Sequence, residues 1–264
     1  AEVGCNTFLL EKGNELGGLA SLISKIPAKN RLADFPHYLM HRAEQLDNLY
    51  IFKNTEGTPE NIRKFHPNII VSSTGSAPLL PPIAGLKDRI DNENHNIYSI
   101  LGMISHINDF PKDLEGKKVV VVGGGAVGLD VVEFFADRNA DISIVEMMDQ
   151  IGRDLDPVSK NDTKTMMKKH NVHQLTKTAL LEVKDSSFLV RGEGEPYELP
   201  FEYGFVCLGM RANAPIWNDI QEAFTGEDVE VLNIGDSVRA RRIIDGTDAG
   251  RHMVLNTLER LNYL

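Results

Sequence analysis

A run of four valines followed directly by three glycines constrains the fold of this chain more than any other feature. Residues 118–122 are KVVVV, and an unbroken β-branched run is typical of a strand buried on both faces of a parallel sheet. Residues 123–128 are GGGAVG, which matches G-x-G-x-x-G. A helix is expected over 129–138, and a second strand over 141–145. The order strand, glycine turn, helix, strand predicts a dinucleotide-binding unit.

Each position of the glycine turn has a physical role in such a unit. Gly123 permits the tight turn from strand to helix, and Gly125 has no side chain, so a pyrophosphate can approach its backbone closely. Gly128 lets the helix pack against the strand. The free N–H groups of the first helical turn, which includes Val127, are expected to hold the pyrophosphate.

The second strand ends at Glu146, and this carboxylate predicts which nucleotide binds. It would accept hydrogen bonds from the ribose hydroxyls and would repel a 2′-phosphate. We therefore expect NADH, with NADPH disfavoured, although Arg153 nearby could weaken the discrimination.

A second carboxylate, Glu11, ends another apolar segment. Residues 7–11 are TFLLE, which predicts a short buried strand, and a glycine-rich turn follows at residues 13–18. In the complete unit Gly123 precedes Glu146 by 23 positions, whereas only ten residues precede Glu11. We expect a second dinucleotide-binding domain that lacks its first strand and glycine loop.

The rest of the pattern predicts an α/β protein with two Rossmann-like domains, the second inserted into the first. Residues 1–107 and 228–264 would form the outer domain, and residues 108–227 the inner one. Trp217 and Phe224 are expected to pack under a loop. The further helices are expected near 36–46, 97–108, 159–170 and 247–261, the further strands at 49–52, 68–72, 205–208 and 229–234, a structured loop at 73–85 and hairpins within 172–200.

Composition excludes several other classes of protein. The net charge is −10 and no Lys/Arg-rich run offsets it, so nucleic acid and membrane surfaces are poor partners. Cys5 and Cys207 are too few for a disulfide framework, a CxxC pair or an iron–sulfur site, and they favour a cytoplasmic location. No apolar run reaches the roughly 20 residues of a membrane span. The eight histidines show no metal-binding spacing, so no metal site is expected.

Four segments occur in the order found in flavoproteins with two dinucleotide-binding domains: FLLEKGNELGG, SSTGSAPLLPPIAG, VVVVGGGAVGLD and NIGD. Together they resemble the C-terminal part of the 2,4-dienoyl-CoA reductase and 2-enoate reductase family. The resemblance covers nearly the whole chain. It implies that the inner domain binds NAD(P)H and that the outer domain binds FAD.

The resemblance also implies roles for single residues. Glu11 would bind the FAD adenosine ribose, with Gly17 and Gly18 close to the cofactor. Asp236, which follows Gly235, would bind the ribityl or pyrophosphate part of FAD. The crossings between the domains would be formed by Thr74 and Gly75 beside FAD and by the segment from Leu208 to Asn213, including Gly209, on the nicotinamide side.

In that family hydride passes from NADH to FAD, and electrons pass on to an N-terminal barrel that carries FMN and a 4Fe-4S cluster. The barrel, as a domain or a subunit, is the partner that the resemblance implies, and an oligomer is possible. No side chain is expected to act as acid or base. Two alternatives stay open: a non-enzymatic dinucleotide-binding fragment, or an NADH-dependent reductase of another flavoprotein subfamily.

Overall fold

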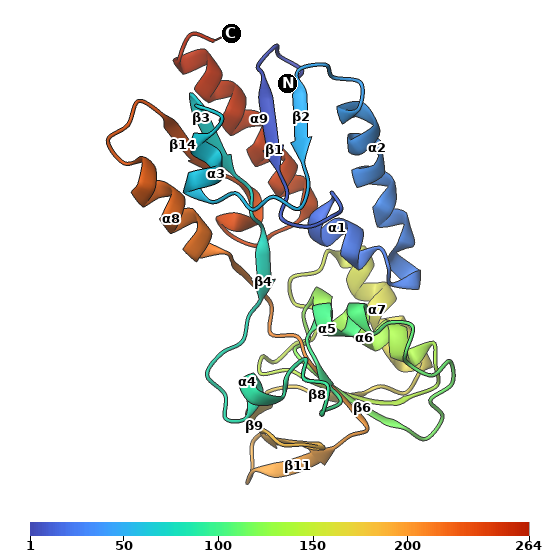
Figure 1. Cartoon of the computed structure of the whole chain (residues 1–264). Helices are drawn as coiled ribbons and strands as arrows, with labels where there is room; N and C mark the ends of the chain where they lie inside the picture. Colours follow the sequence, from blue (N-terminus) through green and yellow to red (C-terminus); the bar gives the residue numbers. More distant parts are fainter. Residues whose placement is uncertain (264) are drawn as a thin grey trace. The chain divides into compact units, whose positions relative to one another are not determined.

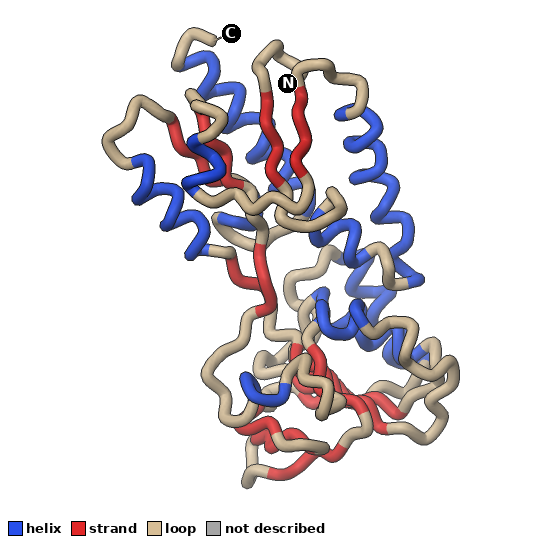
Figure 2. Tube along the Cα trace, in the orientation of Figure 1, coloured by secondary structure: helices blue, strands red, loops and turns tan. Residues whose placement is uncertain are grey.

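The computed structural model describes residues 1–263, which form two compact units (Figures 1 and 2). Unit 1 consists of Ala1–Ser24, Lys29–Ala77 and the residues from Met210 onward. Unit 2 consists of Lys25–Ala28 and Pro78–Gly209. The second unit therefore interrupts the sequence of the first, as an inserted domain does.

Unit 2 is built on a parallel sheet of five strands in the order β5-β12-β6-β7-β8. The central strand β6 is the valine run Lys118–Val122, and helix α6, Ala126–Ala136, follows the glycine turn directly. The prediction of an α/β fold with a parallel sheet is confirmed. The other strands are β5 (Ile97–Tyr98), β12 (Tyr203–Val206), β7 (Asp141–Val145) and β8 (His173–Leu175), and the other helices of the unit are α4 (Leu86–Arg89), α5 (Ile100–Ser105) and α7 (Pro157–Lys169).

Both faces of β6 are buried, which explains why its sequence is a continuous apolar run. Val120 and Val122 belong to a core that includes Phe188 and Val190 of an antiparallel sheet. That sheet has the order β11-β10-β9, formed by Tyr197–Pro200, Ser187–Arg191 and Ala179–Val183, and it fulfils the prediction of hairpins. Aromatic rings gather elsewhere in the unit, where Phe110 contacts Phe135 and Phe205.

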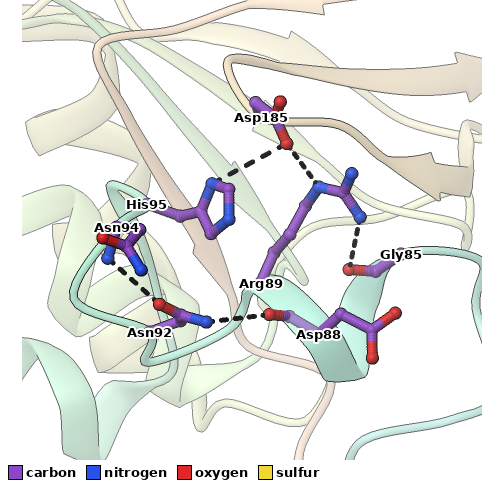
Figure 3. A network of polar contacts seen from close by, with 7 residues as sticks. All are labelled: Gly85, Asp88, Arg89, Asn92, Asn94, His95 and Asp185. Carbon is purple, nitrogen blue, oxygen red and sulfur yellow. Dashed lines mark hydrogen bonds and ion pairs between the residues drawn. The ribbon is translucent and has the colours of Figure 1, made fainter.

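The turn between β9 and β10 is joined by polar contacts to the end of α4 and to the segment that follows it (Figure 3). The carboxylate of Asp185 accepts a hydrogen bond of 2.7 Å from Arg89 Nε, and His95 Nδ1 lies 3.7 Å from the same oxygen. The Arg89 guanidinium lowers the pKa of Asp185. Because the Asp185 side chain is 70% exposed, this pair contributes little to stability and mainly sets the position of the turn.

Unit 1 contains two separate pairs of parallel strands. Strand β1 (Thr7–Leu10) pairs with β2 (Leu49–Phe52), and β3 (Ile69–Ser72) pairs with β14 (Glu230–Asn233). The α-helices of the unit are α1 (Gly18–Ile23), α2 (Asp34–Ala43), α3 (Pro59–Arg63), α8 (Ala214–Phe224) and α9 (Ile243–Arg260). One 3-10 helix spans Pro27–Ala33, of which the first two residues belong to unit 2, and a shorter one spans Gly235–Ser237.

Strand β1 is not buried, contrary to the sequence prediction. Phe8 is 40% exposed and Leu9 is 36% exposed. The N–H groups of Thr7 and Glu11 donate to β2 and its flanks, so the backbone groups of Phe8 and Leu10 point to the other edge. Within the described part of the chain no strand pairs with that edge, and this lack of a second neighbour explains the exposure.

The compact units divide the chain at different places from the predicted 107/108 and 227/228 boundaries. Strand β5, predicted as part of a helix over 97–108, pairs with β12 and so belongs to the inner sheet. Helix α8, predicted as loop, packs through Ile220 and Phe224 against Ile70 of unit 1. The chain crosses between the units at β4 (Ser76–Pro78) and β13 (Met210–Ala212), which pair with each other.

Candidate functional site

Two glycines allow helix α6 to begin directly at the end of β6. Gly123 has a φ of 110°, and a Cβ atom on it would overlap the carbonyl group of Cys207. A Cβ atom on Gly128 would overlap the carbonyl oxygen of Gly123. Packing within the protein therefore requires glycine at both positions.

Gly125 differs from these two glycines because the protein itself does not require it. Its φ is −80°, which any residue can adopt, and a Cβ atom there would meet no atom within 4 Å. The residue is exposed, and Val127 in the first turn of α6 is half-buried beside it. No side chain among residues 1–263 caps this helix through a hydrogen bond at Gly125. The arrangement leaves open space at a helix N-terminus, where an anionic group is favoured.

The Glu146 carboxylate is fixed by two backbone donors. Its Oε2 accepts a hydrogen bond of 2.6 Å from Gly124 N, and its Oε1 accepts one of 2.7 Å from Met148 N. The in-register pairing of Val122 with Val145 places the glycine turn beside Glu146. Each carboxylate oxygen retains acceptor capacity, so the group can bind the hydroxyls of a sugar.

Gly124 lies in the glycine run, but the G-x-G-x-x-G pattern predicts no role for it. A Cβ atom on Gly124 would lie 2.9 Å from Glu146 Oε2 and 3.1 Å from Ile151 Cγ1. The identity of this residue is therefore set by its close approach to Glu146. A pattern of one-dimensional spacing cannot show that approach, because the donor and the acceptor are 22 residues apart.

Glu11 in unit 1 makes the same backbone hydrogen bonds as Glu146. Glu146 N donates to Leu175 O at the end of β8, and Glu11 N donates to Phe52 O at the end of β2. The backbone oxygen of Glu146 accepts from Thr178 N, three residues beyond Leu175, and that of Glu11 accepts from Thr55 N, three residues beyond Phe52. The backbone hydrogen bonds around Glu11 therefore repeat those around Glu146.

The side chains extend this likeness and also show where it stops. Glu11 Oε1 accepts from Gly13 N at 2.6 Å, just as Glu146 Oε1 accepts from the residue two positions after it. For Glu11 Oε2, the hydrogen bonds of residues 1–263 include none that corresponds to the bond from Gly124. Among the described residues, Glu11 Oε2 therefore lacks the backbone donor that Gly124 supplies to Glu146 Oε2.

Gly17 and Gly18, in the turn after Glu11, are both in left-handed conformations. Gly17 precedes α1 with a φ of 104°, and a Cβ atom there would overlap Ser21 Oγ. Gly18 has a φ of 52°, and a Cβ atom there would meet nothing within 4 Å. Gly17 is therefore required by local packing, whereas Gly18 borders open space.

The remaining predicted residues of unit 1 gather at the carboxyl ends of β3 and β14. Asp236 accepts hydrogen bonds from Ser76 Oγ at 3.3 Å and from Arg241 N at 3.1 Å. Gly235, with a φ of 64°, allows the turn that presents Asp236. This brings Asp236 to Ser76 in β4, the strand that follows β3.

Asn213 holds the first crossing segment in place. Its side-chain amide donates to Thr74 O at 2.8 Å, and its backbone N–H donates to Gly75 O at 3.1 Å. Gly209, at the edge of unit 2, accepts from Leu79 N at 2.9 Å and has a φ of 102°.

The described residues also bear on two other features, membrane spans and metal sites. Among residues 1–263, no helix combines the length and apolar character that a membrane span requires. In this part of the chain, no group of three or more histidine, cysteine, aspartate or glutamate side chains is arranged to hold a metal ion.

Residues 40–230 match the family model described as pyridine nucleotide-disulphide oxidoreductase. The chain belongs to this family. The match covers more than half of the sequence and includes the glycine turn and Glu146. It confirms the prediction of a nucleotide-binding portion of a flavoprotein oxidoreductase.

Two curated relatives are similar over almost the whole chain. The NADH oxidase of Thermoanaerobacter brockii is 26% identical over 251 residues, covering 95% of this chain and 37% of that protein. The metal reductase of Desulforamulus reducens is 25% identical over 278 residues, covering 92% of this chain and 39% of that protein. Both are named as oxidoreductases, in agreement with the predicted class of enzyme.

Two solved structures share the fold. A complex of 2-naphthoyl-CoA reductase with 2-naphthoyl-CoA matches with a TM-score of 0.77 and 22% identity, over 94% of this chain and 35% of that chain. Histamine dehydrogenase from Rhizobium sp. 4-9 matches with a TM-score of 0.79 and 16% identity, over 95% of this chain and 38% of that chain. This chain spans less than two fifths of the length of each of these four proteins.

The family description includes disulphide chemistry, and the two cysteines bear on it. Cys207 is buried beside the glycine turn, and burial raises the pKa of its thiol to about 12. Only the thiolate is an effective nucleophile. Cys207 therefore remains a neutral thiol at physiological pH and serves packing.

We expect Cys207 to resist thiol reagents in the folded protein. In a Cys5→Ser variant at pH 8, reaction with a chromogenic disulfide should be at least about a hundredfold slower than after unfolding in urea, because both burial and the raised pKa suppress the thiolate. The rate should increase as the pH approaches 12. Rapid labelling of the folded variant at pH 8 would contradict this assignment.

Proposed function

We propose that unit 2 binds NADH and that unit 1 is part of an FAD-binding domain, within a larger flavin-dependent oxidoreductase. The observation that carries the proposal is the open space at Gly125 beside the oriented carboxylate of Glu146. Glycine is required at Gly123 and Gly128 by the protein itself, whereas the open space at Gly125 lies at a helix N-terminus, where a pyrophosphate can approach the backbone closely.

The pyrophosphate of NADH is assigned to the start of α6, where the backbone N–H groups of Ala126 and Val127 are available at the helix N-terminus. The adenosine ribose is assigned to Glu146, whose two oxygens are already oriented by Gly124 and Met148. The carboxylate would repel a 2′-phosphate, which supports NADH over NADPH. The segment that contains Gly209 is assigned to the nicotinamide side.

The residues of unit 1 fit FAD at two places. Glu11 repeats the backbone hydrogen bonds of Glu146, and we assign it to the FAD adenosine ribose. Asp236 and Gly235, with Thr74 and Gly75 on the neighbouring segment, are assigned to the ribityl and pyrophosphate part. Gly17 and Gly18 would pass close to the cofactor, and Gly18 has the open space that this needs.

The uncovered edge of β1 indicates what completes this site. In unit 2, β6 occupies the corresponding edge of β7 and delivers the N–H of Gly124 to Glu146. We propose that in the whole protein a parallel strand and glycine turn upstream of residue 1 occupy the edge of β1 and donate an N–H to Glu11 Oε2. The isolated chain would then hold FAD weakly.

When bound, FAD supplies the capacity to accept a hydride from NADH and to release electrons singly. This chain contributes binding and orientation, and none of its side chains needs to exchange a proton in the transfer. We propose that electrons continue to a barrel domain with FMN and a 4Fe-4S cluster, and that the substrate resembles a 2,4-dienoyl-CoA or a 2-enoate. A cytoplasmic location is proposed from the two unpaired cysteines.

A second candidate is an NADH-dependent flavoprotein with another electron acceptor. The similarity to a protein named NADH oxidase and to one named metal reductase favours it. Both candidates share the NADH site in unit 2, so the first tests address that site.

Gly125→Ala should weaken NADH binding without destabilising the protein. The added methyl group enters space that no protein atom occupies, so stability should change by less than about 0.5 kcal/mol. Affinity should fall by about tenfold or more, a change of about 1.4 kcal/mol, because the methyl group obstructs the pyrophosphate. NADH fluorescence titration and urea denaturation measure the two effects.

The matched control for this substitution is Gly194→Ala, in an exposed turn where a Cβ atom also meets nothing within 4 Å. It should change neither property. Unaltered NADH affinity in Gly125→Ala would contradict the assignment of the pyrophosphate to this turn.

Glu146→Arg should change the nucleotide preference. Losing the carboxylate weakens the hold on the ribose hydroxyls, and the added cation attracts a 2′-phosphate, so the NADH/NADPH affinity ratio should fall by at least about tenfold. Parallel titrations with both nucleotides measure the ratio. Glu195→Arg, the same charge change in the exposed turn before β11, is the control, and an unchanged ratio in Glu146→Arg would refute the ribose assignment.

Visible absorption spectra test the flavin site. The chain of 264 residues, reconstituted with FAD and then gel-filtered, should retain little flavin, whereas a polypeptide extended upstream to include the proposed strand should retain it and lose its flavin band on anaerobic addition of NADH. Stable flavin in the shorter chain would disprove the need for the added strand. Flavin that NADH does not bleach in the extended polypeptide would disprove the hydride transfer.

A further inference from the structure

The segment between β7 and α7 makes a second contact with the glycine turn that the proposed function does not use. Gly152 N donates a hydrogen bond of 2.7 Å to the carbonyl oxygen of Gly124. The N–H of the same Gly124 donates to Glu146 Oε2. Both backbone groups of Gly124 are therefore engaged, one by the segment and one by the carboxylate.

Side-chain packing supports the same contact. Ile151 Cγ1 would lie 3.1 Å from a Cβ atom on Gly124, so this side chain lies close against the Gly124 backbone. Gly152 is buried, and a Cβ atom on it would lie 3.1 Å from Leu155 Cδ1 and 3.5 Å from Leu129 Cδ1 of α6. Residues 151 and 152 therefore pack against both the glycine turn and the helix that it begins.

Both ends of the segment are anchored. It begins at Met148, whose N–H donates to Glu146 Oε1, and it ends at Asp156, whose carboxylate caps α7 by accepting from Val158 N and Ser159 N. The hydrogen bonds of Ser159 lower the pKa of Asp156, so the cap stays ionised at neutral pH. Because both ends are held by hydrogen bonds, the segment keeps Gly152 in place beside Gly124.

We infer that Gly152 is a positioning residue for the ribose-binding carboxylate. Its N–H orients the Gly124 peptide, and the oriented Gly124 N–H in turn holds Glu146 Oε2. The inference rests on the proposed NADH site. It adds that affinity for the adenosine half of the nucleotide depends on a glycine outside the G-x-G-x-x-G motif.

Glycine is needed at this position for its backbone conformation. Gly152 has a φ of 65°, in the left-handed region that residues with a Cβ atom rarely adopt. Alanine would favour a negative φ, and the shift would turn the N–H away from Gly124 O. Asparagine tolerates the left-handed region better than alanine, but its larger polar side chain would be buried against Leu155 and Leu129, so it would not preserve the contact.

The test uses the full chain and NADH fluorescence titration. Gly152→Ala should weaken NADH binding by about tenfold, because alanine disfavours the left-handed conformation that directs this N–H to Gly124 O. The matched control is Gly116→Ala, which places the same substitution at a φ of 74° where a Cβ atom meets nothing within 4 Å. The control should leave NADH affinity unchanged.

A double-mutant cycle separates positioning from general damage. If Gly152 acts through Glu146, then Gly152→Ala should cause no further loss of NADH affinity in a Glu146→Ala background, whereas independent effects would multiply. Multiplicative losses would overturn the inference. So would an unchanged affinity in Gly152→Ala, or an equal loss in Gly116→Ala.

The failure of this inference can be distinguished from failure of the proposed function. If the unsubstituted chain does not bind NADH, the proposed function is wrong and the inference falls with it. If the unsubstituted chain binds NADH and loses affinity in Glu146→Ala, but not in Gly152→Ala, only the positioning role is wrong. If Gly152→Ala does not fold, Ile151→Ala decides, again within the cycle with Glu146→Ala, because it removes the side chain that packs against Gly124 and leaves Gly152 as glycine.

Discussion

The close approach of α6 to the end of β6 is the constraint on which the candidate site depends. It is possible because Gly123 and Gly128 have no side chains where each meets a backbone carbonyl. Once the helix starts there, its free N–H groups face open space at Gly125, and Gly124 comes within hydrogen-bond distance of Glu146. One steric condition thus creates both an anion-binding helix end and an oriented carboxylate.

Unit 1 repeats part of this hydrogen bonding around Glu11, at the end of a strand with one uncovered edge. The backbone hydrogen bonds around Glu11 repeat those around Glu146, including the turn that follows the neighbouring strand. The donor that corresponds to Gly124 is the part that unit 1 does not supply, and the exposed Phe8 and Leu9 lie on the strand whose edge is uncovered. Comparing the two units therefore gives a physical reason to expect unequal affinities for their two nucleotides.

The strongest features of the fold follow from the sequence. The valine run at 118–122 predicted the central strand of a parallel sheet, because only a strand covered on both faces is so uniformly apolar. The same reasoning failed for residues 7–10. An apolar run shows that a strand prefers burial, but it does not show whether a neighbouring strand is present to bury it.

Helix α8 was missed for a different reason. Trp217 and Phe224 were expected to pack under a loop, yet Pro215 is favoured in the first turn of a helix, and Ile216, Ile220 and Phe224 recur at the spacing of one helical face. The places of Gly125 at the start of α6 and of Glu146 at the end of β7 could be predicted from spacing, whereas their roles in binding stay predictions. The contacts of Gly124 and Gly152 could not be predicted, because they join segments whose distance is fixed only by the folded backbone.

The most direct test of the account is a crystal structure of this chain with NADH bound. The account predicts pyrophosphate oxygens within hydrogen-bond distance of the N–H groups at the start of α6, and both adenosine ribose hydroxyls on the Glu146 carboxylate with its bond to Gly124 intact. A nucleotide bound elsewhere, or one whose ribose does not contact Glu146, would contradict it.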